Sequence, residues 1–199
     1  MKHLEIVRVP VEIKLDDFYL KGSPILNQTR KLKDISLIFK DQEALKRISP
    51  EMLCYTVQLY FPVSEGTPGA MGFGNTFIYP GKVGDEYIMT KGHFHAKGES
   101  SEFYWGVQGK GMLIMMDRER NTWAEEMYLG SLHYIGENIA HRVANTGDTI
   151  LIFGASWTSD AGHDYETIAR DGFSARLLEI DGEPVLVSES SSAKADVNG

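Results

Sequence analysis

Short runs in which apolar and polar residues alternate, separated by glycine, dominate the chain from about residue 53 to residue 187. Alternation of this kind predicts strands, because successive side chains of a strand point to opposite faces of a sheet. Most of the runs end at Gly, Asn or Asp, which is typical of turns between antiparallel strands. The predicted strands are residues 53–63, 76–79, 86–90, 102–107, 112–116, 123–128, 141–144 and 149–157. The pattern therefore predicts an all-β fold, either a sandwich or a barrel.

Turn and helix signals are fewer. The charged run 117–121 predicts a hairpin loop between two of these strands, and residues 180–183 predict a tight turn. Residues 41–48 have a candidate cap and the apolar spacing of a helix, and residues 164–170 predict two helical turns that end near Gly172. We therefore expect few helices, all of them short.

The chain divides into three parts. Residues 1–50 are less regular, with strand-like runs at 6–13 and 35–39, and we expect them to form an N-terminal arm that packs on the barrel or on a partner chain. Residues 51–187 form the barrel, since 199 residues that are 42% hydrophobic suit one domain with one core. Residues 188–199 are rich in Ser, Ala and charge and have almost nothing to bury, which predicts a disordered tail.

Charge and cysteine content exclude several classes of protein. No stretch of about 18 apolar residues is present to span a bilayer, and the charged N-terminus is not followed by the apolar run of a secretory signal. The single cysteine, Cys54, rules out an internal disulfide and fits a reducing compartment, so we expect a cytoplasmic protein. The net charge of −8 argues against nucleic-acid binding, although a small phosphorylated substrate needs only a local pocket.

The segment from Thr90 to Lys97 carries the strongest chemical signal. It holds His93 and His95 two positions apart, and in a strand such residues project to the same face, about 6.6 Å apart along the backbone. Phe94 would point to the opposite face and pack there. On a helix the two imidazoles would diverge by about 200°, so the spacing favours a strand on which both rings bind one ion.

Glu102 and His141 complete a candidate metal site. Three imidazoles and one carboxylate form a ligand set for a divalent first-row metal and leave positions open for water or substrate oxygens. A single histidine is more often a surface or structural residue, but the combination on an all-β pattern favours a metal site. Glu99 is the alternative carboxylate, yet it lies in a predicted loop, whereas Glu102 opens a strand. We therefore expect the metal ligands to be His93, His95, Glu102 and His141.

The spacing of these residues resembles the two cupin motifs. His93, His95, Glu102 and Gly109 match the first motif, and Gly130, His141 and Asn145 match the second. The resemblance implies a cupin double-stranded β-helix, which is a jelly-roll-like barrel. Departures from the motifs, such as Tyr87 at a position that is usually glycine, point to a subgroup of the superfamily.

Three longer strings indicate which subgroup it is. Residues 79–84 (YPGKVG), 90–97 (TKGHFHAK) and 160–165 (DAGHDY) occur in an order and spacing that resemble the cupin-type glucose-6-phosphate isomerases of archaea and bacteria. The resemblance runs from about residue 55 to residue 187. It implies a metal-dependent enzyme that reversibly isomerises glucose 6-phosphate and fructose 6-phosphate, a step of glycolysis and gluconeogenesis.

The resemblance also implies substrate-binding residues. The positions that match the sugar-phosphate pocket of the family are Tyr55, Thr76, Thr90, Gly92, Tyr104, His163 and Tyr165. Small donors such as the Thr90 hydroxyl and the backbone N–H groups near Gly92 can approach a phosphate closely. Lys91 and Lys97 add positive charge nearby. Thr90 and Tyr104 also have a simpler interpretation, as ordinary strand residues.

Two catalytic roles follow for residues of this pocket. Glu102 is the candidate base for a proton transfer through an enediol, although a carboxylate that binds a cation has a lowered pKa and is a weaker base. A direct hydride shift between C1 and C2 is the alternative route. His163 is the candidate for assisting ring opening, with a structural turn residue as the simpler interpretation. Trp157, where related sequences can have Tyr, would change the hydrogen bonding of the pocket.

The ligand set also constrains the metal, and the family resemblance constrains the partners. One divalent metal per subunit is expected, with Fe(II) favoured and Mn, Ni, Co or Zn as alternatives. Exposed strand edges and the resemblance favour a homodimer, with no nucleic-acid or membrane partner.

Two other functions stay open: a non-haem iron cupin dioxygenase, which consumes oxygen, and a non-catalytic sugar-phosphate-binding cupin, which binds without turnover. A side activity on mannose 6-phosphate is also open.

Overall fold

The structure is a computed structural model, and it describes residues 9–189. Within this range the strands are β1 (Glu12–Ile13), β2 (Leu20–Lys21), β3 (Leu26–Lys31), β4 (Leu53–Tyr60), β5 (Met71–Ile78), β6 (Lys82–Val83), β7 (Glu86–Tyr87), β8 (Glu102–Gln108), β9 (Lys110–Met116), β10 (Thr122–Tyr128), β11 (Leu132–Ile135), β12 (Ala140–Asn145), β13 (Leu151–Thr158), β14 (Ala175–Ile180) and β15 (Glu183–Ser188). The helices are α1 (Leu32–Ile35), the 3-10 helix η1 (Ser36–Ile38), α2 (Gln42–Lys46) and α3 (Tyr165–Asp171).

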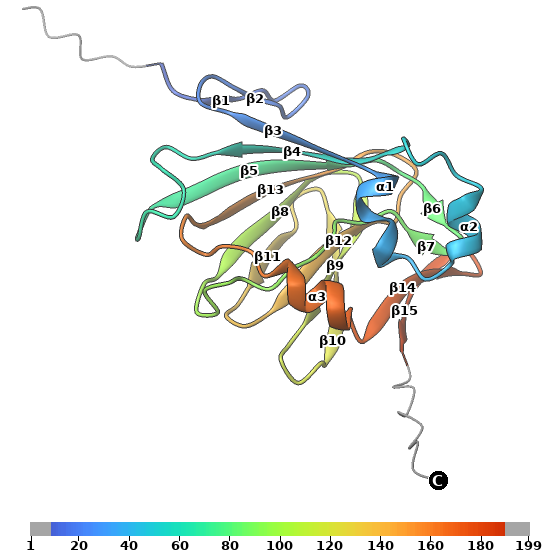
Figure 1. Cartoon of the computed structure of the whole chain (residues 1–199). Helices are drawn as coiled ribbons and strands as arrows, with labels where there is room; N and C mark the ends of the chain where they lie inside the picture. The colour runs from blue at the N-terminus through green and yellow to red at the C-terminus, as the bar shows by residue number, and fades with distance from the viewer. Residues whose placement is uncertain (1–8, 190–199) are drawn as a thin grey trace, which may run out of the picture.

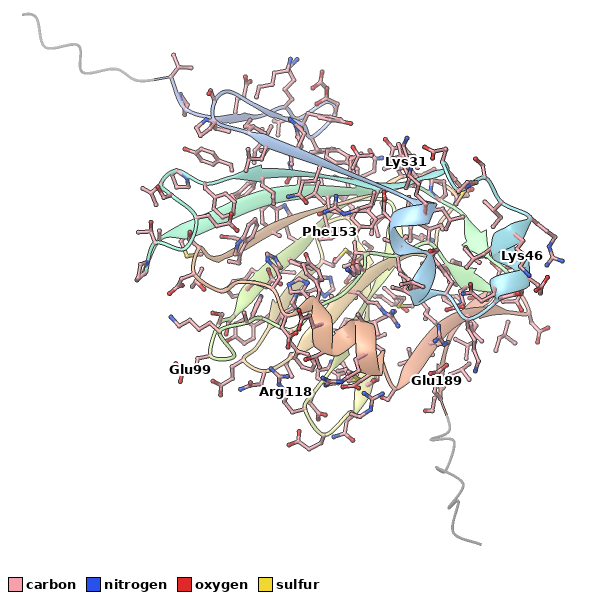
Figure 2. The ribbon with its side chains drawn as sticks, viewed as in Figure 1. Lys31, Lys46, Glu99, Arg118, Phe153 and Glu189 are labelled. Atoms are coloured by element: carbon pink, nitrogen blue, oxygen red, sulfur yellow. The ribbon has the colours of Figure 1, made fainter. Side chains whose placement is uncertain are left out.

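Two antiparallel sheets face each other and enclose the core (Figure 1). The larger sheet has the strand order β11-β8-β13-β5-β4-β3, and the smaller has the order β10-β9-β12. Single bridges from Met89 to Ala144 and from His93 to His141 extend the smaller sheet beyond β12. Phe153 on β13 lies between the two sheets (Figure 2). The expectation of an all-β barrel is therefore confirmed.

A further sheet, with the order β15-β14-β7-β6, lies beside α1 and α2 (Figure 1). Arg176 of β14 donates to the Glu86 carboxylate of β7 at 2.7 Å and to the Ile38 carbonyl at 3.0 Å. Glu86 is buried and also accepts the Lys40 backbone N–H at 2.6 Å. These hydrogen bonds join the sheet to the segment that follows α1.

The N-terminal arm contributes to both faces of the larger sheet. β3 pairs with β4 and forms one edge of that sheet. Leu32, Ile35 and Phe39 are each 2% exposed and pack into the core. The β1–β2 hairpin contributes the segment that covers the outer face, where Tyr19 stacks on Phe77 with 4.5 Å between ring centroids. The arm therefore covers part of the outer face and adds an edge strand to the larger sheet.

Most of the predicted strands form where the alternation indicates them. The charged run 117–121 joins β9 to β10, and the turn at 180–183 joins β14 to β15, as predicted. Both helix predictions are confirmed as well. The Asp41 side chain caps α2 by accepting the Ala44 backbone N–H at 2.8 Å, and α3 ends at Asp171 with Gly172 as its C-cap.

The strand expected at residues 35–39 is wrong. These residues end α1 and continue into the 3-10 helix. The Asp34 carboxylate accepts the Lys31 backbone N–H at 2.8 Å, which stabilises the first turn of the helix. Leu32 and Ile35, three positions apart, then bury one helical face, and this burial outweighs the β propensity of the run.

Four strands fall outside the sequence prediction: β2 and β6, which have two residues each, β3 and β11. β3 reads Leu-Asn-Gln-Thr-Arg-Lys, and as an edge strand it carries polar side chains that hide the period of two. β11 has only four residues, which is too short for a clear alternation. At the ends of the chain, β15 extends to Ser188, where the tail was expected to begin. Residues 1–8, which include part of the expected run 6–13, and residues 190–199 lie outside the described residues.

Candidate metal centre and its pocket

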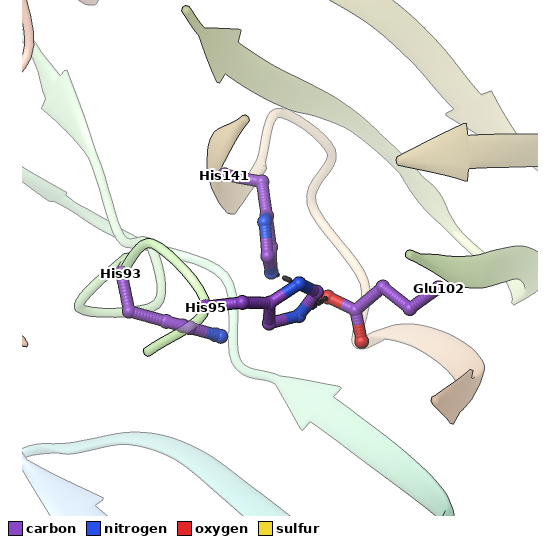
Figure 3. A group of neighbouring side chains, drawn as sticks. All are labelled: His93, His95, Glu102 and His141. Carbon is purple, nitrogen blue, oxygen red and sulfur yellow. Dashed lines mark ion pairs between the residues drawn. The ribbon is translucent and has the colours of Figure 1, made fainter. Parts of the chain in front are cut away.

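Four side chains expected to bind a metal meet between the two main sheets (Figure 3). Glu102 begins β8 of the larger sheet, and His141 lies on β12 of the smaller sheet. His93 and His95 come from the segment that extends the smaller sheet. One ligand atom from each of the four side chains lies within 4.8 Å of the others. The fold thus brings together a nitrogen- and oxygen-containing ligand set.

The segment from Thr90 to Lys97 is not a continuous strand, which corrects the expectation. It makes single bridges at His93 and Phe94. The regular ladder is interrupted at Gly92, whose φ of +79° lies in the left-handed region. His93 and His95 still meet in one cluster, and Phe94 between them is buried in the core.

Backbone hydrogen bonds hold two of the ligands next to each other. The His93 N–H donates to the His141 carbonyl at 3.3 Å, and the His141 N–H donates back to the His93 carbonyl at 3.0 Å. Gly92 allows this close approach, since a Cβ at that position would lie 3.0 Å from Phe173 and 3.1 Å from Arg142. The position therefore requires glycine for its conformation and for its packing.

Two of the imidazoles are oriented by carbonyl groups. Nδ1 of His95 lies 3.1 Å from the Ser100 carbonyl, and Nδ1 of His141 lies 3.2 Å from the Ile139 carbonyl. A carbonyl can only accept, so Nδ1 carries the proton in each ring. The unprotonated Nε2 atoms are then free to bind a metal, an arrangement common to histidine ligands.

The cluster contains buried polar atoms that need a cation. Nε2 of His141 lies 2.5 Å from Oε1 of Glu102, yet neither atom has a hydrogen bond of acceptable geometry among residues 9–189. His141 is 1% exposed and Glu102 is 5% exposed. Two buried acceptor atoms this close raise the free energy of the folded state unless a positive charge lies beside them. The donor set and its unsatisfied atoms therefore fit a divalent metal.

The protonation states of His93 and Glu102 agree with metal binding. Burial, with contributions from His141 and His163, holds the pKa of His93 well below its usual value, so the ring is neutral. Burial alone would raise the pKa of Glu102, but the surrounding histidines outweigh it and hold that pKa below the usual range. A neutral imidazole and an ionised carboxylate are the forms that bind metals.

The alternative residues lie elsewhere. Glu99 is exposed on a surface loop and is not part of the cluster (Figure 2). Lys97 is exposed and pairs with Asp160 at 2.8 Å, outside the residues that line the pocket.

A cavity of about 390 Å³ adjoins the cluster. It is lined by all seven residues expected to bind substrate and by three of the ligands: Tyr55, Thr76, Thr90, Gly92, Tyr104, His163, Tyr165, His93, Glu102 and His141. Strand register explains much of this convergence. Val57, Thr76 and Phe153 lie opposite one another on β4, β5 and β13, so their side chains share the inner face.

His163, just before α3, and Tyr165, its first residue, are exposed and line the cavity. The rings of His163 and Tyr165 are parallel, with centroids 5.4 Å apart, and the His163 ring centroid is 4.4 Å from that of His93. Burial lowers the pKa of His163 below its usual value, so its imidazole is neutral near pH 7. It can therefore accept a proton.

Hydroxyl donors surround the rest of the cavity. Burial, with a contribution from Glu102, holds the pKa of Tyr104 well above its usual value, and burial raises the pKa of Tyr55 to about 12. Both hydroxyls thus keep their protons. The Thr90 oxygen accepts the Val143 backbone N–H at 3.0 Å, which leaves the Thr90 hydrogen available to a ligand.

Several pocket residues were absent from the residue set expected from the sequence. Gln28 and Arg30 line the cavity from β3, and Glu65 lines it from the loop after β4. Gln28 and Arg30 could not be predicted as pocket residues, because β3 is a polar edge strand without a clear alternation of apolar and polar residues. Trp157, which the sequence marks as a departure from Tyr, lines the cavity and packs edge-on against Phe61, with 5.7 Å between ring centroids.

A double-sheet β-barrel with three histidines and a glutamate beside a cavity defines a metal-binding barrel of the cupin type. A family model described as glucose-6-phosphate isomerase (GPI) matches residues 29–193. Glucose-6-phosphate isomerase of Thermococcus litoralis is 40% identical over 79% of this chain and 83% of its own. The enzyme of Pyrococcus furiosus is 39% identical over 89% of this chain and 93% of its own. The chain therefore belongs to the glucose-6-phosphate isomerase family.

Solved structures overlap with a smaller part of the fold. Oxalate decarboxylase from Bacillus subtilis is 17% identical, with a TM-score of 0.44 over 55% of this chain and 26% of that one. In the part of the chain that the structure describes, no helix is both long and apolar enough to cross a membrane.

Proposed function

We propose that this protein reversibly isomerises glucose 6-phosphate and fructose 6-phosphate, with one divalent metal bound by His93, His95, Glu102 and His141. The observation that carries the proposal is that one cavity is lined both by the buried metal-ligand cluster and by the segment from Thr90 to His93 (the TKGH segment), with its hydroxyl and backbone N–H donors. Membership of the glucose-6-phosphate isomerase family supports the same reaction. A cavity of about 390 Å³ is also of the size that encloses a small-molecule ligand.

The substrate has a defined orientation in this proposal. C1 and C2 of the sugar lie at the metal cluster, and the phosphate lies against Thr90, Gly92 and Tyr55. The free hydrogen of the Thr90 hydroxyl supports this orientation. Gly92 supports it too, because the absence of a side chain lets a phosphate approach the backbone N–H groups.

A divalent metal in the cluster would supply Lewis-acid polarisation of the substrate carbonyl. The other steps belong to the protein. His163, neutral near pH 7, moves the proton from the anomeric hydroxyl to the ring oxygen as the ring opens. Tyr104, which keeps its proton, donates to the oxygen that becomes negative during isomerisation.

The hydrogen transfer between C1 and C2 has two routes. In the first, Glu102 removes a proton and an enediol forms; in the second, a hydride moves directly between the carbons. The lowered pKa of Glu102 favours the hydride route, because a weak base removes a carbon-bound proton poorly. Isomerisation in deuterated water tests this. We expect no solvent deuterium at C1 or C2 of the product, and incorporation at either carbon would instead support the enediol.

The proposed activity is tested by a coupled assay of fructose 6-phosphate conversion. The assay is run on the purified protein, after chelation, and after addition of Fe(II), Mn(II), Ni(II), Co(II) or Zn(II) singly. We expect activity to disappear on chelation and to return most strongly with Fe(II). Oxygen consumption would support a dioxygenase instead, and binding without turnover would support a sugar-phosphate-binding protein. Mannose 6-phosphate in the same assay tests for the side activity.

We also propose that the protein is a homodimer. Part of the outer face of the larger sheet is apolar and exposed: Phe103, Leu132 and Tyr134 are 46%, 68% and 58% exposed. Phe103 and Tyr134 pack together with 5.2 Å between ring centroids, beside the free edge of β11. Light scattering after gel filtration tests the assembly. We expect the mass of a dimer for the wild type and of a monomer for Leu132→Asp.

A cytoplasmic location is part of the same proposal. Its substrates are charged sugar phosphates, which do not cross a bilayer unaided. Cys54 is buried, and burial raises the pKa of its thiol to about 12, so the thiol stays protonated and unreactive in a reducing compartment. Cell fractionation with the coupled assay tests this, and activity in an exported fraction would contradict it.

A further inference from the structure

The N-terminal arm places an arginine in the pocket. Arg30 lies on β3 directly opposite Tyr55 on β4. Directly opposite residues of an antiparallel pair share one face of the sheet, and both side chains line the cavity. Arg30 therefore reaches the cavity from a strand that the alternation pattern does not reveal.

The guanidinium of Arg30 is held in place without a carboxylate. Its Nη1 donates to the Thr29 carbonyl at 3.1 Å, and its Nη2 donates to Oε1 of Gln28 at 3.0 Å. Among residues 9–189 no ion pair includes Arg30. An arginine has five N–H donors, so these two bonds leave donors for a ligand.

A second cation, Lys91, belongs to the same end of the cavity. Its Nζ lies 4.9 Å from the ring centroid of Tyr165. The charge of Arg30 reaches this region too, because it opposes the rise that burial causes in the pKa of Tyr55 and of Tyr165. Two positive charges from distant parts of the sequence thus act on one group of tyrosines.

Two acidic residues of the cavity, Asp34 and Glu65, form no ion pair with these cations within residues 9–189. Asp34 lines the cavity, but Oδ2 of its carboxylate accepts the Lys31 backbone N–H at 2.8 Å. Glu65 also lines the cavity, from the loop after β4. Among residues 9–189 neither Arg30 nor Lys91 forms an ion pair, so both cations stay available to an anionic ligand.

We propose that Arg30 is a specificity-determining residue that binds the phosphate dianion of the sugar phosphate, together with the Thr90–Gly92 segment. This rests on the proposed isomerase function. The planar guanidinium presents two parallel N–H donors that match two phosphate oxygens, which a lysine cannot do. The N-terminal arm is thereby part of the substrate site. The preference of the enzyme for phosphorylated over free sugar depends on Arg30.

The test compares R30Q and R30K with the wild type in two measurements. The first is the KM and kcat for fructose 6-phosphate and for free fructose. The second is the Kd of inorganic phosphate for the metal-loaded protein, measured by calorimetry. The control is R47Q, since Arg47 follows α2, is exposed and lies outside the cavity. Thermal unfolding of each variant checks that it is folded.

For R30Q we expect the KM for fructose 6-phosphate and the Kd of phosphate to rise roughly 10- to 100-fold, the loss that follows removal of a charge-assisted hydrogen bond. R30K should lie between R30Q and the wild type, and R47Q should match the wild type. The kcat/KM for free fructose should change less than about 2-fold in R30Q, because that substrate has no phosphate.

Two results would overturn the role of Arg30. One is an unchanged Kd of phosphate in R30Q, and the other is an equal loss of kcat/KM for phosphorylated and free fructose. Failure of the proposed function gives a different result, since the wild type itself would then show no turnover. The calorimetric comparison would still decide whether Arg30 binds phosphate.

Discussion

His141 connects the metal cluster to the smaller sheet. It is 1% exposed, its backbone is hydrogen-bonded to His93, and its Nε2 faces Glu102. Replacement by alanine removes one ligand and leaves the Glu102 carboxylate buried without its neighbour. We expect His141→Ala to bind less than one metal per chain and to lose at least about 100-fold in activity. Elemental analysis after gel filtration, beside the coupled assay, measures both.

The matched control is another buried histidine. His133 is 3% exposed and is hydrogen-bonded to Glu125 at 2.7 Å and to Ser131 at 2.9 Å, away from the cluster. His133→Ala should lose stability, because it leaves Ser131 without one of its partners, but it should keep its metal. Full metal content and full activity in His141→Ala would contradict the assignment of this ligand.

Gly92 gives a second prediction at this scale. Its φ is +79°, and an added Cβ would crowd Phe173 and Arg142. Gly130 has a similar φ of +89° but nothing within 4 Å of an added Cβ. We expect Gly130→Ala to lower the free energy of unfolding by about 1 kcal/mol and Gly92→Ala by about 2–3 kcal/mol. Urea unfolding of the metal-free proteins measures both, and equal losses would show that packing does not constrain Gly92.

At the scale of elements, α3 positions Tyr165 at the pocket and depends on its cap. The Asp164 carboxylate accepts the Thr167 hydroxyl at 2.7 Å and the Thr167 backbone N–H at 3.1 Å, and these bonds lower the pKa of Asp164. The lowered pKa makes the cap fully stabilising above about pH 4, the pKa of an unfolded aspartate. As the pH falls through that value, the unfolded chain takes up the proton first and the stabilisation is lost.

Asp164→Ala should therefore lower the Tm by roughly 2–4 °C at pH 7. At pH 3 its Tm should approach that of the wild type. Asp171→Ala is the control, because Asp171 lies at the other end of α3, where its carboxylate accepts from the side chain of exposed Arg170 and does not cap the helix. Calorimetry at pH 7, 5 and 3 measures the series. A difference between Asp164→Ala and wild type that stays constant over this range would argue against the cap.

The elements also show which parts of the fold a sequence reveals. β8 is predictable because Glu102 and Tyr104 alternate with exposed residues on a strand that is solvated on one face only. β3 is not, because an edge strand carries polar side chains on both faces and loses its period. The segment from Thr90 to Lys97 lies between these cases. The spacing of its histidines can be recognised in the sequence. Its bridge from His93 to His141 cannot, because it depends on β12, which is distant in the sequence.

At the scale of the whole molecule, the metal links the two main sheets. The ligands come from β8, from β12 and from the segment after β7, so an ion bound there favours the folded state over the unfolded chain. Metal at about 100 times its Kd should stabilise the protein by about 2.7 kcal/mol and raise the Tm by roughly 5–10 °C. Calorimetry before and after chelation measures the shift. His141→Ala serves as the control, and a shift of equal size in that variant would mean that the metal binds elsewhere.

The candidate site was predictable only in part. The metal ligands and the TKGH segment could be recognised because their residue types and spacing carry the chemistry. Arg30 could not, since nothing in the polar run around it indicates that β3 pairs with β4 beside Tyr55. That juxtaposition comes from tertiary pairing between the arm and the barrel, which local patterns do not encode.

The reciprocal hydrogen bonds between His93 and His141 have a consequence for folding kinetics. They join segments far apart in the sequence, and such contacts form only after the intervening strands have closed a long loop. The ligands therefore meet late, when β9 and β12 are already paired. Metal in the refolding buffer should slow unfolding and leave the folding rate unchanged, because the ion binds a barrel that the chain has already built.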